Sequence, residues 1–234
     1  MEKCLLSIDW DYFIKTPNQK WSSQLESKKT AVDLWYKLYF QASNRGRNIQ
    51  QFFELAQEAT KFWDKLGTIF QLKEGITAYV SDSHALSFKI AKDKGLNVVY
   101  LFDSHADLGY GGLSSLNFEV NCANWLGKLL KEGLVKEANI IYGPYTAEKP
   151  EFFKEINQTY NVRYLTLEQL GGRAITVEAV HICRSGAWTP PWYDNQFVDF
   201  VKRSGLGYRF INCPSRKWNP NNLSFAEQID YLLA

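Results

Sequence analysis

The most informative stretch of this 234-residue chain is residues 98–107, VVYLFDSHAD, which closes on Asp103-Ser104-His105-Ala106-Asp107. Its five β-prone residues carry no polar residue at alternate positions, which is typical of a strand buried on both faces of a parallel sheet. Ligands of open α/β sheets bind just outside the carboxyl ends of strands. Two carboxylates and an imidazole there predict a site for a divalent metal such as Mn, Zn or Fe, the alternative being a solvated polar turn.

Two other segments repeat this arrangement of a short apolar strand followed by polar residues. Residues 4–8 run into Asp9-Trp10-Asp11, whose two carboxylates point the same way if the extended conformation continues. Residues 76–80 run into Ser81-Asp82-Ser83-His84, which is a helix-capping segment in its simplest interpretation. The chain has only three histidines, and two of them follow strands beside acidic residues, which favours metal ligation by His84 and His105.

Strands that alternate with helices predict a three-layer α/β/α fold with a mainly parallel sheet. The apolar patterns predict strands at 4–8, 76–80, 98–102, 139–142, 162–165 and 180–183, and helices at 30–42, 49–66, 85–94, 121–132, 150–157, 194–203 and 224–233. We expect one domain over residues 1–234, with a helical insertion at about 14–75 that starts in a turn at 16–18. Residues 205–222, rich in Pro, Asn and Gly, are expected to be irregular.

Composition excludes several classes of function. The net charge of +2 indicates no nucleic-acid surface, and no apolar run is long enough to span a membrane. Two aspartates interrupt the first apolar segment, so no secretory signal is expected, and the four cysteines form no C-x-x-C pair. We therefore expect a cytoplasmic protein with reduced thiols, whose partner is a small-molecule substrate. The oligomeric state is left open.

Together the three polar segments resemble motifs of the arginase/deacetylase superfamily. Asp103-Ser104-His105-Ala106-Asp107 resembles the family's D-A-H-x-D, and Ser7-Ile8-Asp9-Trp10-Asp11 resembles its S-x-D-x-D. Ser81-Asp82-Ser83-His84 is similar to the G-G-D-H segment that supplies one histidine ligand. The uncharacterised arginase-like proteins that begin with a D-x-D strand look closest to this arrangement.

The resemblance implies a site for two divalent metal ions, most often manganese, although the deacetylase branch of the family uses a single zinc. Asp9 and Asp103 would bridge the two ions. His84 and Asp107 would complete one ion, and His105 and Asp11 the other. A metal-activated hydroxide would then hydrolyse a non-peptide C–N bond in an amide or amidine.

The chain departs from the family pattern in ways that bear on fold and substrate. Its D-x-D strand precedes the D-S-H-A-D motif, which requires either a circularly permuted fold or an N-terminal strand in the place of the later one. Where the ureohydrolases place an acidic residue near the last strand, this chain has Arg184. We expect Arg184 to anchor an anionic or neutral amide between Trp188, Trp192 and Tyr193, with a salt bridge as its alternative role. His181 is expected to be a packed core histidine.

Two other functions remain open from the sequence. One is a metal- or ligand-binding protein that keeps the arginase-like fold without turnover. The other is a Mg-dependent phosphatase of the haloacid-dehalogenase type, which also begins with a buried strand and D-x-D, with Asp9 as nucleophile. That family has Thr or Val where this chain has Phe13, and it has no need for His84 or His105.

Overall fold

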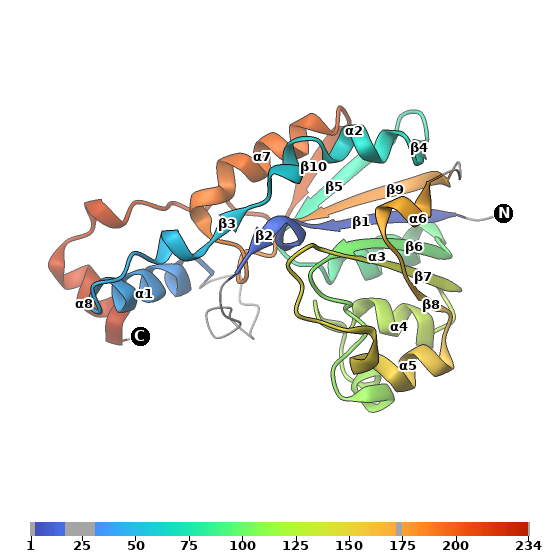
Figure 1. The fold of residues 1–234 in the computed structure, drawn as a ribbon, viewed down its shortest axis with the longest axis horizontal. Coiled ribbons are helices and arrows are strands. Elements are labelled where there is room, and N and C mark those ends of the chain that lie inside the picture. Colours follow the sequence, from blue (N-terminus) through green and yellow to red (C-terminus); the bar gives the residue numbers. More distant parts are fainter. Residues whose placement is uncertain (1–2, 17–30, 172–174, 234) are drawn as a thin grey trace.

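The computed structural model describes residues 3–16, 31–171 and 175–233, and its centre is an eight-stranded sheet (Figure 1). Its strands all pair in parallel, which confirms the predicted α/β class with a mainly parallel sheet. Across the sheet the order is β10 (Gly207–Ile211), β5 (Thr77–Ser81), β9 (Ile175–Cys183), β1 (Cys4–Asp9), β6 (Val98–Asp103), β7 (Glu137–Tyr142) and β8 (Val162–Tyr164). β4 (Phe70–Leu72) pairs with the first residues of β9.

Helices cover both faces of the sheet and make the three layers that the sequence predicts. The helices α2 (Phe62–Gly67) and α7 (Asp194–Arg203) lie on one face, and α3 (Leu86–Lys94), α4 (Trp125–Lys131) and α5 (Lys154–Thr159) on the other (Figure 1). Within β6, Tyr100 and Phe102 pack into the first core and Val99 and Leu101 into the second. This double burial explains why the strand is apolar at every position.

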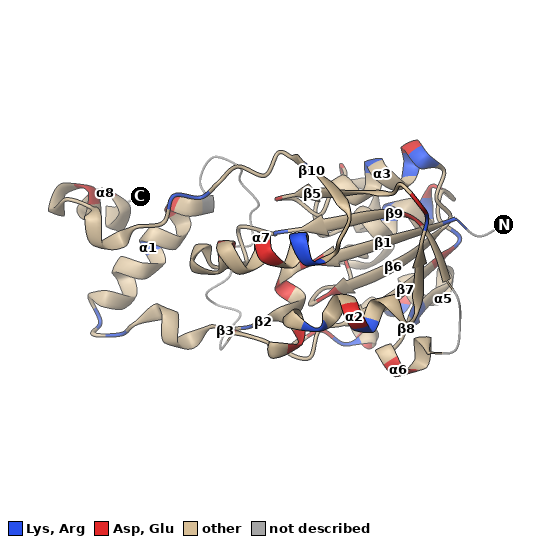
Figure 2. Ribbon diagram, turned by 90° about the horizontal axis from the view of Figure 1, so that it is seen from above, with Lys and Arg blue, Asp and Glu red and all other residues tan. Residues whose placement is uncertain are grey.

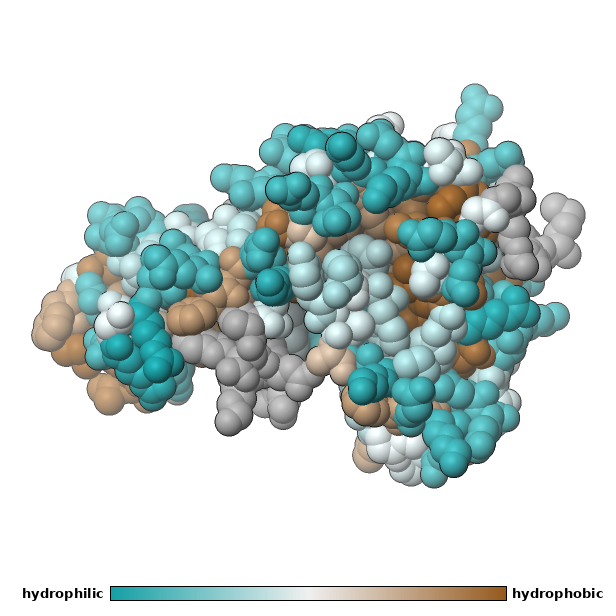
Figure 3. All heavy atoms as spheres, in the orientation of Figure 1, coloured by the Kyte–Doolittle hydropathy of each residue, from teal (hydrophilic) through white to brown (hydrophobic). Residues whose placement is uncertain are grey.

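A helical arm projects beyond the carboxyl ends of the strands and brings α1 against the last helix of the chain (Figure 1). Figures 1 and 2 show α1 (Ala31–Ser43) beside α8 (Phe225–Leu233), away from the sheet. Tyr36 of α1 stacks on Tyr231 of α8 at 4.8 Å between ring centroids and on Trp218 at 4.6 Å. The tip of the arm carries an apolar patch among polar side chains (Figure 3), to which Phe225 and Leu233 contribute with exposed fractions of 77% and 82%.

The helix predicted over residues 49–66 is wrong. This segment instead forms η3 (Ile49–Phe52), β3 (Glu54–Leu55) and η4 (Gln57–Thr60) before α2 begins. β3 pairs antiparallel with β2 (Ile14–Lys15), and the Ala56 amide donates to the Phe13 carbonyl over 2.8 Å. The apolar residues have helical spacing, but the chain must extend here to connect the arm to the sheet, and its backbone groups pair with β2 instead.

Two other segments also differ from the expectation. Residues 205–222 contain the regular strand β10, which pairs in parallel with β5 at the edge of the sheet, followed by the short turn η8 (Pro220–Asn222). β10 is mostly exposed and lacks the alternating pattern that identifies a strand. The helix expected at 121–132 begins only at Trp125, because Asn121 and Asn124 are tied into the preceding turn.

The other elements are short. They are η1 (Trp10–Phe13), η5 (Gly112–Asn117), η6 (Pro150–Phe153), α6 (Leu167–Leu170) and η7 (Pro191–Tyr193). The predicted start of the first helix at Thr30, and the turn at 16–18 from Pro17 onward, lie outside the described residues. Among the described helices, none has the length and apolar composition needed to cross a membrane.

Candidate metal centre

The polar residues that follow β1, β5 and β6 converge at the carboxyl edge of the sheet. β1 pairs with β6 on one side and with β9 on the other, and β9 pairs in turn with β5. The extended conformation does not continue past Asp9, which caps η1 and whose Oδ1 accepts from the Asp11 amide at 3.1 Å. Both carboxylates nevertheless reach the site and are buried.

Three carboxylates surround one nitrogen of His84. Its Nδ1 atom lies 2.9 Å from Asp107 Oδ2, 3.0 Å from Asp103 Oδ2 and 3.2 Å from Asp9 Oδ2. The ligand atoms offered by Asp9, His84 and Asp103 all lie within 4.8 Å of one another, and all three residues are buried. This is a compact set of nitrogen and oxygen donors of the kind that Mn, Fe and Zn accept.

A second group of donors is adjacent and shares Asp103 with the first. His105 Nδ1 lies 2.9 Å from Asp11 Oδ2 and 3.5 Å from Asp103 Oδ1. Asp11, Asp103 and His105 again offer atoms within 4.8 Å of one another. Asp103 therefore turns one carboxylate oxygen toward His84 and the other toward His105, which is the arrangement that a ligand shared by two ions requires.

Behind the site runs a buried chain of hydrogen bonds whose direction can be assigned. It ends at the Ser83 carbonyl, which only accepts, so the Ser81 hydroxyl donates to it at 2.7 Å. Ser81 Oγ must then accept from His181 Nε2 at 2.8 Å, and His181 Nδ1 accepts from the Ser87 hydroxyl at 2.6 Å. Burial, followed by repulsion from His84, lowers the pKa of His181 well below its ordinary value, so the ring is neutral as this direction requires.

The same direction continues to the metal ligand. Because the Ser87 proton is engaged with His181, Ser7 must donate to Ser87 at 2.8 Å and must accept from His84 Nε2 at 2.7 Å. His84 therefore carries a proton on Nε2 and turns Nδ1 toward the carboxylates. Although those oxygens are close, His84 Nδ1 and Asp103 Oδ2 have no hydrogen-bond partner of suitable geometry among the described residues. Two buried unpartnered atoms facing each other are what a bound cation would satisfy.

Contacts with α4 and with the loop after β9 position the carboxylates of Asp107 and Asp9. Asp107 has φ of 51°, and its Oδ2 accepts from Trp125 Nε1 at 2.5 Å. Its carbonyl accepts from the Leu126 amide at 3.1 Å. Ser185, which also has φ of 51°, donates its hydroxyl to Asp9 Oδ2. Left-handed backbone at non-glycine residues is costly, and it is retained here at two residues that define the site.

The electrostatics of the cluster are those of crowded charges. Burial, followed by repulsion from the other carboxylates, raises the pKa of Asp103 well above its usual range, and the same causes raise that of Asp9. Burial would raise the pKa of Asp11 too, but attraction to His105 outweighs it and the net shift is downward. Burial alone would lower the pKa of His84 and of His105. The adjacent carboxylates have the larger, opposite effect, so both pKa values lie well above the ordinary value.

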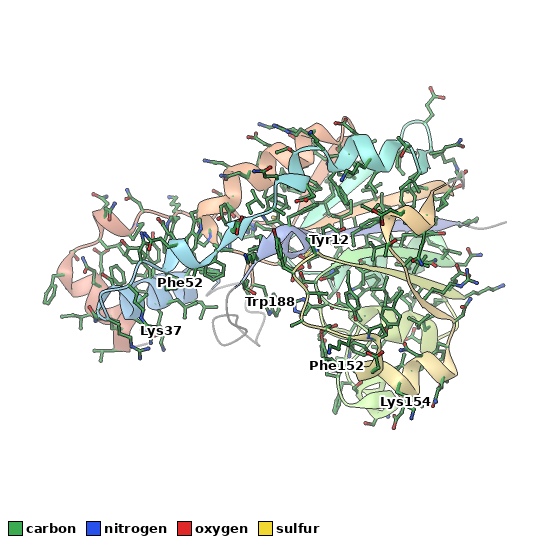
Figure 4. All side chains as sticks on the ribbon, viewed as in Figure 1. Tyr12, Lys37, Phe52, Phe152, Lys154 and Trp188 are labelled. Carbon is green, nitrogen blue, oxygen red and sulfur yellow. The ribbon has the colours of Figure 1, made fainter. Side chains whose placement is uncertain are left out.

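The candidate centre opens into a cavity of about 480 Å³. Its walls come from the metal-site residues and from several loops. They comprise Asp9, Asp11, His84, His105, Asp107, Tyr110, Cys122, Ala123, Glu148, Ser185 and Trp188. Trp188, expected from the sequence as a wall, is thus at the cavity, and Figure 4 shows it near η1 where the strands end. A cavity of this size suits a small molecule.

The structure does not bring Arg184 to this cavity. Its side chain is 4% exposed and donates to Asp82 Oδ1 at 2.8 Å, to Asp194 Oδ2 at 3.3 Å and to the Pro214 carbonyl at 2.8 Å. These contacts use the guanidinium inside the protein. They favour the alternative role of Arg184, a salt bridge, over that of a substrate anchor. Trp192 likewise packs on Trp35 in the core, at 5.5 Å between ring centroids, instead of lining the cavity.

Sequence reasoning missed Glu148, Tyr110 and Ser185. Glu148 comes from the loop after β7, far along the chain from the motifs, and an isolated acidic residue in a loop carries no pattern. Tyr110 lies three residues after Asp107, and the sequence shows it only as part of a glycine-rich turn. Ser185 follows β9, which is the neighbour of β1 in the sheet, so a correct strand order could have indicated it.

The donor set fits a pair of divalent ions, given two imidazole nitrogens, four carboxylates and a buried pair of unpartnered atoms directed at each other. Comparison with protein-family models, with curated proteins and with solved structures finds no match to this chain.

Proposed function

We propose that this protein is a metal-dependent hydrolase that cleaves a non-peptide C–N bond, of an amide or amidine, at a dinuclear centre. Asp9, His84, Asp103 and Asp107 would hold one ion, and Asp11, His105 and Asp103 the other. Asp9, a second bridging ligand by the resemblance, is assigned to the first ion alone because its Oδ1 accepts from the Asp11 amide. The observation that carries the proposal is the position of Asp103, whose two oxygens face the Nδ1 atoms of two histidines in two overlapping donor groups.

The donors support manganese as the preferred ion, with zinc and iron as alternatives. Four carboxylates with two imidazoles form an oxygen-rich set without thiolates, which suits Mn better than a structural zinc. Two such ions would supply Lewis acidity that lowers the pKa of a water and makes it a nucleophile near neutral pH. The chain's own residues would orient the ligands, and Trp188 and Tyr110 would border the substrate.

The substrate is proposed to be a small molecule, because the cavity has room for one. Membrane and nucleic-acid partners are not proposed. All four cysteines lie in the described residues and none forms a disulfide, which supports a reducing, cytoplasmic location as part of the proposal.

A phosphatase with Asp9 as nucleophile is less well supported. Asp9 Oδ1 is engaged by the Asp11 amide, and Oδ2 accepts from Ser185 and lies 3.2 Å from His84. A nucleophile needs a free oxygen aimed at its substrate. A metal-binding protein without turnover shares the same site, and activity measurements separate it from a hydrolase.

The test is metal loading followed by a substrate panel. Protein purified without a chelating tag is dialysed against Mn²⁺, its bound metal is counted by mass spectrometry, and it is then assayed on amides, amidines and guanidines. We expect about two Mn²⁺ per chain and turnover of at least one C–N substrate. Two ions with no turnover on the panel would favour the binding protein.

A further inference from the structure

Hydrolysis of a C–N bond needs a proton for the departing nitrogen, because amide and amine anions are too basic to leave unaided. The six predicted metal ligands are committed to their ions. Tyr110, Cys122 and Glu148 are the remaining titratable groups on the described cavity wall. If the proposed function holds, on which the assignment below depends, these three side chains are the candidates for supplying the proton.

Glu148 is held over the metal loop by three donors from three segments. Its Oε2 accepts from the Ala106 amide at 2.9 Å and from the Tyr142 hydroxyl at 3.4 Å. Its Oε1 accepts from the Tyr110 hydroxyl. Ala106 stands between His105 and Asp107, so Glu148 is bonded to the backbone between two predicted ligands.

The loop that carries Glu148 is itself fastened to the metal loop. The Thr146 hydroxyl donates to the Ser104 carbonyl at 2.5 Å, and the Glu148 amide donates to Thr146 Oγ1 at 3.1 Å. The Gly143 amide donates to the Asp103 carbonyl at 2.9 Å. A carboxyl held from both ends in this way has a defined position relative to the metal ligands, as a proton donor requires.

The pKa values of Glu148 and of its neighbour Tyr110 are both raised. Partial burial raises the pKa of Glu148 above its usual value, although the Tyr110 hydrogen bond, His105 and the Ala106 amide oppose it. Partial burial and the adjacent Glu148 carboxylate raise the pKa of Tyr110 as well, which makes the phenol a weaker acid. Tyr110 uses its own proton in the hydrogen bond to Glu148 Oε1, so Tyr110 orients the carboxyl, and Glu148 is left as the acid at the cavity wall.

We propose that Glu148 is the general acid of the reaction, donating a proton to the nitrogen that leaves when the C–N bond breaks. The water oxygen forms a bond to the carbonyl or amidine carbon, the C–N bond breaks, and the Glu148 proton passes to the departing nitrogen. The amine leaves neutral and Glu148 is left as a carboxylate. The proton lost by the attacking water restores the carboxyl, so no other reactant is consumed.

Two chromogenic probes distinguish a general acid from a residue that affects metal binding or folding. 4-Nitrophenyl acetate and 4-nitroacetanilide share their acyl group and ring and differ in the leaving atom. The 4-nitrophenolate departs without a proton, whereas the anilide nitrogen needs one. In Mn²⁺-loaded protein, Glu148→Gln should lower kcat for the anilide by about 10²- to 10⁴-fold. It should leave ester hydrolysis, metal stoichiometry and Tm close to those of the wild type.

Controls make each outcome decisive. Glu151→Gln, at an exposed position three residues further on, should leave both rates unchanged. Glu148→Asp keeps the acid and should retain part of the anilide activity. Equal loss of ester and anilide rates in Glu148→Gln, or no loss of either, would overturn the role of Glu148. Wild-type protein that loads Mn²⁺ but cleaves neither the anilide nor any amide, amidine or guanidine of the panel would instead refute C–N hydrolysis itself, and the general-acid role with it.

Discussion

His84 Nε2 lies 2.7 Å from Ser7 Oγ, and the hydrogen bonds beyond Ser7 leave His84 as the donor in this contact. A neutral His84 therefore has its lone pair on Nδ1, among three carboxylate oxygens. Without a cation or a proton at that point the arrangement would be repulsive. The direction of the buried serine–histidine hydrogen bonds thus determines that Nδ1 is the atom His84 offers to a metal. The residues of this site are separated by up to about a hundred positions in sequence.

Ser87→Ala should weaken metal binding, because it interrupts this chain between His181 and Ser7. Loss of a partner that orients a ligand costs about 10- to 100-fold in metal affinity. Isothermal titration with Mn²⁺ measures the change. Ser204→Ala is the control and should bind as the wild type does, because the Ser204 hydroxyl donates to the Val201 carbonyl and accepts from the Leu206 amide, neither of which belongs to the metal site. Equal affinities in all three proteins would remove the orienting role of the chain.

Metal affinity should rise with pH. Burial lowers the pKa of His84 and His105, but the surrounding carboxylates raise it by more than burial lowers it. Both rings are therefore protonated near neutrality when no metal is bound. Each proton that the metal displaces adds about tenfold in affinity per pH unit until the raised pKa is passed. Calorimetry in buffers of different ionisation enthalpy should also detect the released protons. A pH-independent affinity would contradict the assignment of these rings as ligands.

The same protons determine how stability changes with pH. A histidine whose folded pKa is raised stabilises the fold fully below its unfolded pKa of about 6.5 and loses that contribution as pH rises through the folded value. The metal-bound protein does not depend on these two protons. The increase in Tm on adding Mn²⁺ should therefore be larger at about pH 8.5 than at about pH 6. Thermal scans with and without Mn²⁺ at both pH values measure it, and the opposite order would be inconsistent with the account.

Gly127→Ala should disturb the metal loop. A Cβ at Gly127 would overlap the Leu108 carbonyl oxygen, and the Gly127 amide bonds the Asp107 carbonyl at 3.3 Å. Forcing this contact apart should cost about 1–3 kcal/mol of stability and displace Asp107 from its ion. Gly67→Ala, in α2 with open space around its Cβ position, is the control. Denaturant unfolding and Mn²⁺ titration of both variants test this, and equal behaviour would show that α4 does not position Asp107.

Arg184→Met should act on folding and not on substrate affinity. It would leave Asp82, 2.8 Å from Arg184 Nε, as an unpaired buried carboxylate, at a cost of about 3–5 kcal/mol. Arg163→Met removes a partly exposed pair with Glu137 and should cost less than about 1 kcal/mol. Urea unfolding compares the two. A stable Arg184→Met protein with a raised KM would restore the substrate-anchor hypothesis.

Much of the sheet could be predicted because its strands are buried on both faces. The unbroken apolar runs of β1 and β6, with polar residues directly after them, indicate strands and a site at once. β10 was missed because an exposed edge strand has no such run. The apolar spacing of residues 49–66 predicts a helix wrongly, because spacing indicates which side chains are buried but not which backbone groups pair.

The candidate site, too, could be predicted only where local sequence patterns indicate it. The six predicted ligands converge because each directly follows a strand or belongs to its loop, and neighbouring strand ends meet in a parallel sheet. Arg184 also follows a strand, but its partner Asp82 comes from a different one, and nothing in the local sequence pairs them. Glu148 reaches the cavity only through the fold of its loop over Ala106.

The most direct measurement of the central claim is the number of metal ions bound by the wild type and by Asp103→Ala, counted by mass spectrometry after loading with Mn²⁺. Asp103 faces both histidines, so its removal should reduce about two bound ions to fewer than one. Circular dichroism checks that the variant remains folded. A wild-type protein that binds no metal after loading, or an Asp103→Ala variant that still binds two ions, would contradict the account.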